Sequence, residues 1–416
     1  MRYINKRTSI LNFMVERIRR RKTDIMETAS KRPLTPDELL QLMSRSFYPG
    51  ILLLQELRGL SEHDKKAYVG CAYNILRELD TIEDSSLSVQ DKVMLFDIFV
   101  RIIDKIAQRS KGGNIDDLIT RSLPAHEENM EFITDILKKG VRSDEERIFV
   151  EHFGRGVVLR ELNGFDKDVR DGINYCTGRM TFGMKGFLER GKIETTPQLR
   201  EYCFSVAGSI GEFLTNLVNS KDAAILRDRR LDEGLAQKFG EFLQLTNIAK
   251  NVREDADAGR AFFPEQYRLD TMSPKDFVYG KGDDAKEARK CSLGSVLGLA
   301  KDNLEDSVRY VTSIPEELSG YKVFCLFPLV IAAKTIETMD NAGAERVFAG
   351  GKSAIKIQHG NNILDFCRGI VTHCVGVNAN LWLSEYAQNP VAFSFEDKLY
   401  KKWSPDWLER IKEKKD

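Results

Sequence analysis

The sequence predicts an all-α protein organised as a single large domain. Apolar residues recur every three or four positions along most of the chain from about Thr35 onward, and alternating runs typical of strands are few. Several of the 11 prolines stand where a helix should begin, as in Thr35-Pro36, Thr196-Pro197 and Ser273-Pro274. Because 42% of the 416 residues are apolar, the chain can bury a substantial core.

The charge balance and the metal-binding residue types exclude several classes of function. The 63 basic and 63 acidic side chains cancel, so no net charge attracts a nucleic acid. The seven cysteines form no CxxC pair and the five histidines form no HxxxH or HExxH pattern. We therefore expect buried thiols in a reducing compartment and no zinc site. Since no apolar run of about 18 residues and no signal-peptide core is present, we expect a cytoplasmic protein.

Composition divides the chain into three parts. Residues 1–34 form a basic N-terminal segment, residues 35–388 the helical domain, and residues 389–416 a polar C-terminal tail. Residues 1–22 interleave basic and apolar side chains, which is compatible with two interpretations. They either lie on an anionic bilayer as an amphipathic helix, which would make the protein peripheral at the membrane surface, or form a solvated basic helix packed on the domain. Residues 255–290 break the helical pattern and predict a loop-rich connection.

Two polar clusters with identical spacing carry the strongest functional signal. The first consists of Asp80, Glu83 and Asp84, and the second of Asn251, Glu254 and Asp255. Positions i, i+3 and i+4 share one face of a helix, so the members of each cluster project together. Oxygen ligands of this kind suit Mg²⁺, which bridges carboxylates to substrate phosphates. A solvated helix face would explain one such cluster, whereas two with matched spacing favour magnesium ions that hold a diphosphate from both sides.

The residues around these clusters resemble the squalene and phytoene synthase family, from about Ser44 to Gly360. The matching elements are Ser44–Phe47 as Ser-Arg-Ser-Phe, Tyr73–Asp84 as the first aspartate-rich motif, Tyr202–Gly208 as Tyr-Cys-x-x-Val-Ala-Gly, Gln244–Asp255 as the second motif, and Gly259–Pro264 as Gly-Arg-x-Phe-x-Pro. The resemblance implies an isoprenoid-synthase-type helical bundle around a central cavity. Val323–Pro328 and Ile355–Gly360 are similar to elements of the squalene branch, the second of them associated with NADPH.

The resemblance also implies an activity. Two molecules of farnesyl diphosphate would be joined head to head to presqualene diphosphate and then reductively rearranged to squalene, with Mg²⁺ and NADPH as cofactors and the protein acting as a monomer. Two alternatives stay open. The enzyme could omit the reductive step and release presqualene diphosphate, dehydrosqualene or phytoene, or the chain could be a prenyl-lipid-binding scaffold without catalysis.

Residue roles follow from the matched motifs. Tyr202 is expected to be the acid/base residue. The other residues expected in catalysis are Tyr73, Arg77, Asp80 and Asp84. Substrate contacts are expected from Arg45, Ser46, Phe47, Arg77, Gln244, Asn247, Lys250 and Phe324. Ser44, Arg45, Lys356 and His359 are expected to bind NADPH, and the two polar clusters are expected to hold the metal. An apolar wall is expected from helix faces that include Phe47, Phe182, Met184, Val206, Leu243 and Phe324.

The chain departs from the family pattern at a few of these positions. Asn251 replaces the first aspartate of the second motif, and its carbonyl can bind a metal without contributing charge. Lys250 stands where an arginine is usual, and Gln358 and His359 replace an Arg-Lys pair.

Overall fold

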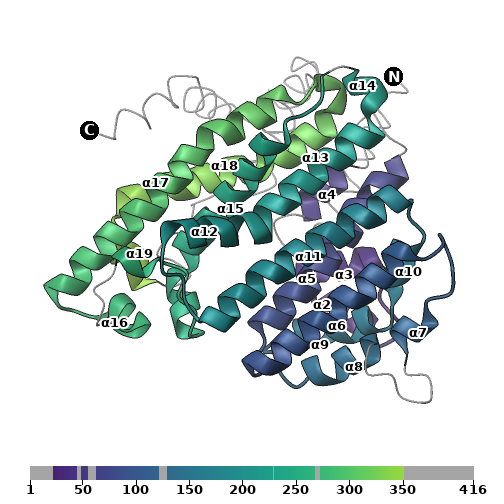
Figure 1. Cartoon of the computed structure of the whole chain (residues 1–416), viewed down its shortest axis with the longest axis horizontal. Coiled ribbons are helices and arrows are strands. Elements are labelled where there is room, and N and C mark those ends of the chain that lie inside the picture. The colour runs from purple at the N-terminus through teal and green to yellow at the C-terminus, as the bar shows by residue number, and fades with distance from the viewer. Residues whose placement is uncertain are drawn as a thin grey trace, which may run out of the picture.

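The computed structural model describes residues 22–44, 48–54, 62–120, 129–227, 229–267 and 272–350. Within these ranges the chain is helical and contains no strand, which confirms the predicted all-α class (Figure 1). The first half contains α2 (Lys22–Ala29), α3 (Pro36–Met43), α4 (Tyr48–Leu53), α5 (Glu62–Asp84), α6 (Val89–Gln108), α7 (Asp116–Ile119), α8 (Met130–Leu137), α9 (Asp144–Gly154), α10 (Val157–Asn163), α11 (Lys167–Arg190) and α12 (Thr196–Cys203).

The second half begins with a short π-helix. Its elements are η1 (Phe204–Gly208), α13 (Ser209–Lys221), α14 (Ala223–Leu226), α15 (Glu233–Asp257), the 3₁₀ turn η2 (Glu265–Tyr267), α16 (Pro274–Tyr279), α17 (Asp283–Ser313), the 3₁₀ turn η3 (Glu316–Leu318), α18 (Ser319–Ala342) and α19 (Ala344–Ala349).

Local sequence explains where several helices start. The Thr35 side chain accepts from the Glu38 N–H at 3.3 Å while Glu38 reaches back to the Thr35 N–H, so a capping box precedes Pro36 at the start of α3. Ser273 caps α16 in the same way ahead of Pro274. At α12 the cap is Thr195, one residue before the expected boundary. These observations confirm the interpretation of the three Thr-Pro and Ser-Pro pairs.

The long helices form two groups that share one middle element. In one group α15, α17 and α18 lie side by side, and in the other α5, α6 and α11 do so (Figure 1). The π-helix η1 packs against both α11 and α15 and thereby joins the groups. Because a π-helix widens the turn locally, elements of this kind often occur at functional sites.

Glycines allow η1 to approach both neighbours at backbone distance. A Cβ placed on Gly183 of α11 would lie 2.5 Å from Cβ of Ser205, and one on Gly240 of α15 would lie 2.3 Å from the carbonyl oxygen of Ala207. Both contacts are shorter than any Cβ tolerates. The segment that follows Tyr202 is therefore held between two helices by positions that accept only glycine.

Two regions differ in detail from the sequence prediction or add to it. The loop-rich connection expected over 255–290 contains α16, and α17 already begins at Asp283, because its polar first turns are made of good helix formers that lack apolar periodicity. In the N-terminal segment α2 packs on α3 and α9 with Ile25 fully buried, and the Leu34 N–H donates to Nδ1 of His152 at 2.9 Å.

Most of the cysteines in the described ranges are buried, and the helices there are not suited to cross a membrane. Cys71, Cys176, Cys203 and Cys325 are buried free thiols, as expected, whereas Cys291 is exposed. None of the helices in the described ranges combines the length and the apolarity that a bilayer crossing requires. The proposed amphipathic helix over residues 1–22 falls almost entirely outside these ranges, as does the polar tail 389–416.

Candidate functional site

One face of α5 carries a row of polar side chains at one-turn intervals. Tyr73 hydrogen bonds with Ser44, which follows α3, and lies within electrostatic range of Arg77 and Asp80. Arg77 pairs with Asp80 through Nη1 and Oδ2 at 3.6 Å and with Glu146 of α9 through Nη2 and Oε1 at 3.6 Å. The structure therefore brings together Ser44, Tyr73, Arg77 and Asp80, as the i, i+4, i+7 spacing along a helix requires.

Asp80 and Asp84 are partly exposed to solvent. Their side chains are 38% and 39% exposed, so water reaches both carboxylates. Nevertheless, the surrounding protein desolvates Asp80 enough to raise its pKa to about 7, although the cation of Arg77 opposes the shift. Both carboxylates can therefore be reached by a ligand from solvent.

Tyr202 contacts the first acidic cluster directly. Its hydroxyl donates to Oε1 of Glu83 at 3.2 Å, and both groups are buried, with Tyr202 3% and Glu83 7% exposed. Burial raises the pKa of Glu83 to about 8, and the negative charges of Asp84 and Asp80 add to the shift. The pKa of Tyr202 is also raised, first by burial and then by Glu83. Glu83 thus uses one of its two carboxylate oxygen atoms, Oε1, to accept from the phenol.

An aromatic cluster holds the Tyr202 ring. Phe262, from the segment after α15, lies 5.0 Å from it and stacks on Phe187 of α11 at 4.3 Å between ring centroids. Phe187 in turn lies 5.5 Å from Tyr202. Aromatic pairs at such distances stabilise one another by about 1 kcal/mol beyond their burial. The cluster fixes the phenol beside Glu83.

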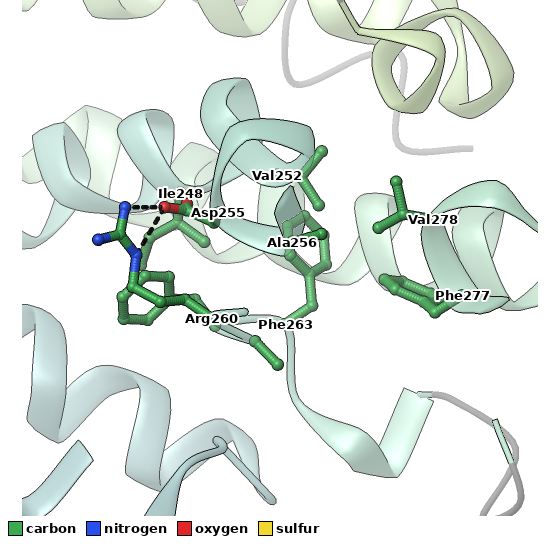
Figure 2. A pocket seen from close by; sticks show the side chains of 10 residues that line it. Ile248, Val252, Asp255, Ala256, Arg260, Phe263, Phe277 and Val278 are labelled. Carbon is green, nitrogen blue, oxygen red and sulfur yellow. Dashed lines mark hydrogen bonds and ion pairs between the residues drawn. The ribbon is translucent and has the colours of Figure 1, made fainter. Parts of the chain in front are cut away.

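Arg260 connects the first acidic cluster to the second. Its Nη1 donates to Oδ1 of Asp84, and its Nη2 and Nε donate to Oδ1 of Asp255 at 2.9 and 3.2 Å. Figure 2 shows the bonds to Asp255. Burial lowers the pKa of Arg260, but Asp84 and Asp255 outweigh it and raise the value overall. The two clusters, 171 positions apart (251 minus 80), therefore meet at one guanidinium.

A magnesium ion fits these residues in donor type. Carboxylate and amide oxygens are its preferred protein ligands. In the described ranges, however, no three Asp, Glu, His or Cys side chains converge closely enough to hold a metal ion. Arg260 bonds to one oxygen atom of Asp84 and to one of Asp255, and Tyr202 bonds to one of Glu83, so these contacts compete with a metal ion for the carboxylates.

A small apolar pocket lies next to the Asp255–Arg260 pair, between α15 and α16 (Figure 2). Ile248, Val252, Phe263, Phe277 and Val278 contribute most of its apolar lining. Its volume of about 20 Å³ accommodates a single water molecule. It is therefore too small for a prenyl chain.

Comparison with known families matches residues 40–358 to squalene/phytoene synthase. The chain belongs to this family. Its membership agrees with the resemblance derived from the motifs and with the all-α fold.

Curated relatives and a solved structure are similar over much of the chain. The squalene synthase clz20 of Cochliobolus lunatus is 30% identical over 276 residues, which cover 64% of this chain and 57% of the relative. The squalene synthases of Yarrowia lipolytica and Saccharomyces cerevisiae are each 28% identical, covering 72% and 73% of this chain and 60% and 61% of the relatives. The chain thus spans about 60% of the length of these proteins. The structure of TcSQS with the ligand E5700 has a TM-score of 0.59 and 26% identity, covering 83% of this chain and 87% of that one.

The polar face of α15 is accessible along its length. Gln244 and Asn251 are partly exposed, and Asn247, Lys250 and Glu254 are exposed. Of the residues predicted on this helix, only Asp255 is brought into contact with the first cluster, through Arg260. The family's two motifs are therefore joined near the ends of α5 and α15, while the earlier turns of α15 stay open to solvent among the described residues.

Two aromatic residues expected in an apolar wall behave differently. Phe324 of α18 is 8% exposed, and a Cβ on Gly50 of α4 would lie 3.2 Å from its ring, so it is a packed residue at the α4–α18 contact. Phe182 of α11 is 59% exposed and lies 5.8 Å from the Arg179 guanidinium. Its neighbour Met184 is buried, so these residues differ in exposure, and their place in the wall of a prenyl pocket stays a prediction.

Several predicted site residues lie outside the described ranges. These are Arg45, Ser46, Phe47, Lys356 and His359.

Three residues near the site were not predicted from the sequence. The first is Arg260, which the sequence indicated only as a member of the Gly-Arg-x-Phe-x-Pro motif. The second is Glu146, which pairs with Arg77, and the third is Lys92 of α6, which donates to the carbonyl oxygen of Glu83 at 2.7 Å. A cation at the last turn of α5 stabilises its free carbonyl groups. The motif position of Arg260 could have signalled its role, but nothing in the sequence marks Glu146 or Lys92.

Proposed function

We propose that the protein catalyses the head-to-head condensation of two farnesyl diphosphates to presqualene diphosphate and its NADPH-dependent conversion to squalene. The observation that carries the proposal is the meeting of the two acidic motifs at Arg260, beside a tyrosine hydrogen-bonded to the first motif. Membership of the squalene/phytoene synthase family and the squalene synthase relatives support the same activity.

The first bond change is ionisation of one farnesyl diphosphate. Its C1–O bond breaks and both electrons leave with the diphosphate, which requires positive charge at the leaving group. Arg77 is placed for this by Asp80 and Glu146, and Arg260 by Asp84 and Asp255. Arginine suits a diphosphate because its planar fork donates two parallel hydrogen bonds. Magnesium at Asp80, Asp84 and Asp255 would supply further neutralising charge.

Tyr202 is the residue that we assign to the proton transfer. The double bond of the second farnesyl diphosphate attacks the allylic cation, and loss of a proton closes the cyclopropane ring. Because the Tyr202 hydroxyl donates its hydrogen to Glu83, the phenolic oxygen can accept this proton from the substrate as its own hydrogen passes along that bond to the Glu83 carboxylate. The aromatic rings of Phe187 and Phe262 around it limit access of water to the cations.

The last step requires a reductant. A second loss of diphosphate and a rearrangement leave a cation that hydride from NADPH reduces to squalene. We assign NADPH binding to Ser44, Arg45, Lys356 and His359, of which Ser44 lies next to Tyr73. The other three fall outside the described ranges.

Product identification tests the proposal. The purified protein is incubated with farnesyl diphosphate and Mg²⁺, with and without NADPH, and the lipids are identified by mass spectrometry. We expect squalene with NADPH and presqualene diphosphate without it. A product that is the same in both reactions, such as dehydrosqualene, would refute the reductive step and leave the condensation.

Two matched variants separate an enzyme from a lipid-binding scaffold. Asp84→Asn should lower the rate of diphosphate release by at least roughly 100-fold, since it removes charge where the leaving group departs. Asp283→Asn removes a carboxylate whose side chain is 97% exposed and should leave the rate unchanged. Tyr202→Phe should still ionise the substrate but form presqualene diphosphate slowly. Equal and undetectable diphosphate release by the wild type and both Asp variants would refute an enzymatic role.

A further inference from the structure

The position of Arg260 is fixed by the way α15 ends. The N–H of Arg260 donates to the carbonyl oxygen of Asp255 at 2.8 Å, and the N–H of Gly259 donates to that of Ala256 at 3.0 Å. Gly259 has a φ of +77°, which a glycine adopts without strain. This is the Schellman arrangement, and it folds the chain back over the last turn of the helix. The reversal places the Arg260 side chain beside Asp255.

The residues after Arg260 anchor this reversal. Ala261, Phe262 and Phe263 are buried at 9%, 7% and 3% exposure, and the Ala261 carbonyl accepts from the N–H of Ile193 at 3.3 Å. The backbone at Arg260 is thus held on both sides. Its side chain is 22% exposed and reaches across to Asp84, which belongs to the other group of helices.

The bonds of Arg260 use the same atoms that a metal ion would use. Oδ1 of Asp84 and Oδ1 of Asp255 both accept from the guanidinium. Arg77 and Lys92 also attract Asp84, and Arg260 is the cation that bonds to both motifs. In the described ranges no three acidic side chains converge on a metal ion in this arrangement.

We propose that Arg260 is a resident counter-cation of the two acidic motifs, which competes with divalent metal ions for Asp84 and Asp255 and is transferred to the diphosphate when metal and diphosphate bind together. The transfer to diphosphate rests on the proposed function, whereas the competition with metal does not.

A purely structural bridge makes the opposite prediction for metal binding. If Arg260 only held the helices together, its removal would separate the carboxylates and weaken the binding of a metal ion. If it competes for the same oxygen atoms, its removal frees them and strengthens metal binding. The sign of the change in metal affinity decides between the two roles.

The test is a titration of the full chain with Mn²⁺ and no other ligand. The concentration of free Mn²⁺ is measured by electron paramagnetic resonance. We expect Arg260→Gln to bind Mn²⁺ roughly tenfold more tightly than the wild type, since displacing one charge-assisted contact costs about that factor. Arg253→Gln is the matched control. Arg253 lies on α15, the helix that carries Asp255. Its guanidinium is 5.1 Å from the Tyr279 ring centroid rather than in a bond to Asp84 or Asp255, so this variant should bind Mn²⁺ like the wild type.

A second variant and a second ligand complete the experiment. Arg260→Lys keeps the positive charge but not the planar guanidinium that bonds to both carboxylates. Its affinity for Mn²⁺ should therefore lie between those of the wild type and Arg260→Gln. This variant provides the test if Arg260→Gln does not fold. With Mn²⁺ saturating, inorganic diphosphate should bind about tenfold more weakly to Arg260→Gln than to the wild type. Unchanged or weaker Mn²⁺ binding in the folded Arg260 variants would overturn the proposal.

Failure of the proposed activity would be seen separately. The Mn²⁺ titration contains no prenyl substrate, so tighter metal binding by Arg260→Gln supports the counter-cation even if no hydrocarbon forms. Conversely, squalene formation together with unchanged Mn²⁺ affinity in the variants would refute the counter-cation and leave the activity in place.

Discussion

Substitution of Gly240 by alanine tests whether η1 is held by backbone contact with α15. The added Cβ would lie 2.3 Å from the Ala207 carbonyl oxygen, whereas ordinary contact begins at 3.4 Å, so the two segments must separate by about 1 Å (3.4 minus 2.3). Overpacking of this kind costs about 1–3 kcal/mol, and alanine returns up to about 1 kcal/mol of helix propensity. Because both sides of the contact are backbone, we expect a net loss of about 2 kcal/mol in the free energy of unfolding.

Gly294 of α17 provides the matched control. It is an exposed helical glycine with no atom within 4 Å of an added Cβ, so Gly294→Ala should raise the free energy of unfolding by about 1 kcal/mol. Urea unfolding followed by far-UV circular dichroism measures both. The two substitutions are chemically identical, and shifts in the same direction would refute the contact argument. At a temperature where both variants are folded, only Gly240→Ala should also slow product formation, because η1 follows Tyr202 directly.

Three further predictions concern stability and charge. Burial and the cation of Arg155 lower the pKa of His152, whose Nδ1 accepts from the Leu34 N–H. The stability that neutral His152 contributes is therefore complete above pH 6.5, its ordinary pKa, and is lost as the pH falls through the lowered pKa of the folded state. His152→Asn keeps an acceptor and should lose less stability in urea unfolding between pH 7 and pH 5 than the wild type does. Glu78 is fully buried on α5, and neither of its carboxylate oxygens has a hydrogen-bond partner among the described residues. Glu78→Met should therefore stabilise the fold by about 1–3 kcal/mol and raise the thermal midpoint, whereas Glu189→Met, at an exposed position, should change the midpoint little. A lower midpoint for Glu78→Met would show that the carboxylate is needed. Asn251→Asp adds a carboxylate one turn before Asp255 and should tighten Mn²⁺ binding several-fold in the same resonance titration, whereas the exposed Asn247→Asp, a turn further back, should have a smaller effect.

Much of the fold could be predicted because its signals are local. The capping box at Thr35 and the Ser273-Pro274 pair mark helix starts through contacts within four residues, and the apolar repeat identifies which face of a helix is buried. The repeat does not identify the neighbour that covers that face. Phe182 lies within the long helix α11 and is nevertheless 59% exposed, beside Arg179 of the same helix.

The candidate site was predictable in its carboxylates and in Arg77, and not in its other partners. The spacing of Asp80, Glu83 and Asp84 identifies the first cluster, and the matched spacing of the second cluster suggested that the two should meet. The other partners come from distant parts of the chain: Glu146 of α9 pairs with Arg77, Lys92 of α6 donates to the Glu83 carbonyl oxygen, and Arg260 follows α15. Arginine and lysine are common on helix surfaces, so a sequence gives no reason to select one of them until the tertiary contacts are known.

The two halves of the junction contribute unequally to its charge, and this inequality has a consequence for the order of binding. The first motif presents Asp80 and Asp84, which are partly exposed and pair with Arg77 and Arg260, whereas the second combines the exposed Glu254 with Asp255, which Arg260 holds, and the uncharged Asn251. A divalent cation is therefore attracted first to α5, whose motif carries three carboxylates against two on α15. Only when a diphosphate provides a new partner for Arg260 does Asp255 become available, so metal sites spanning both helices should form together with the substrate rather than before it.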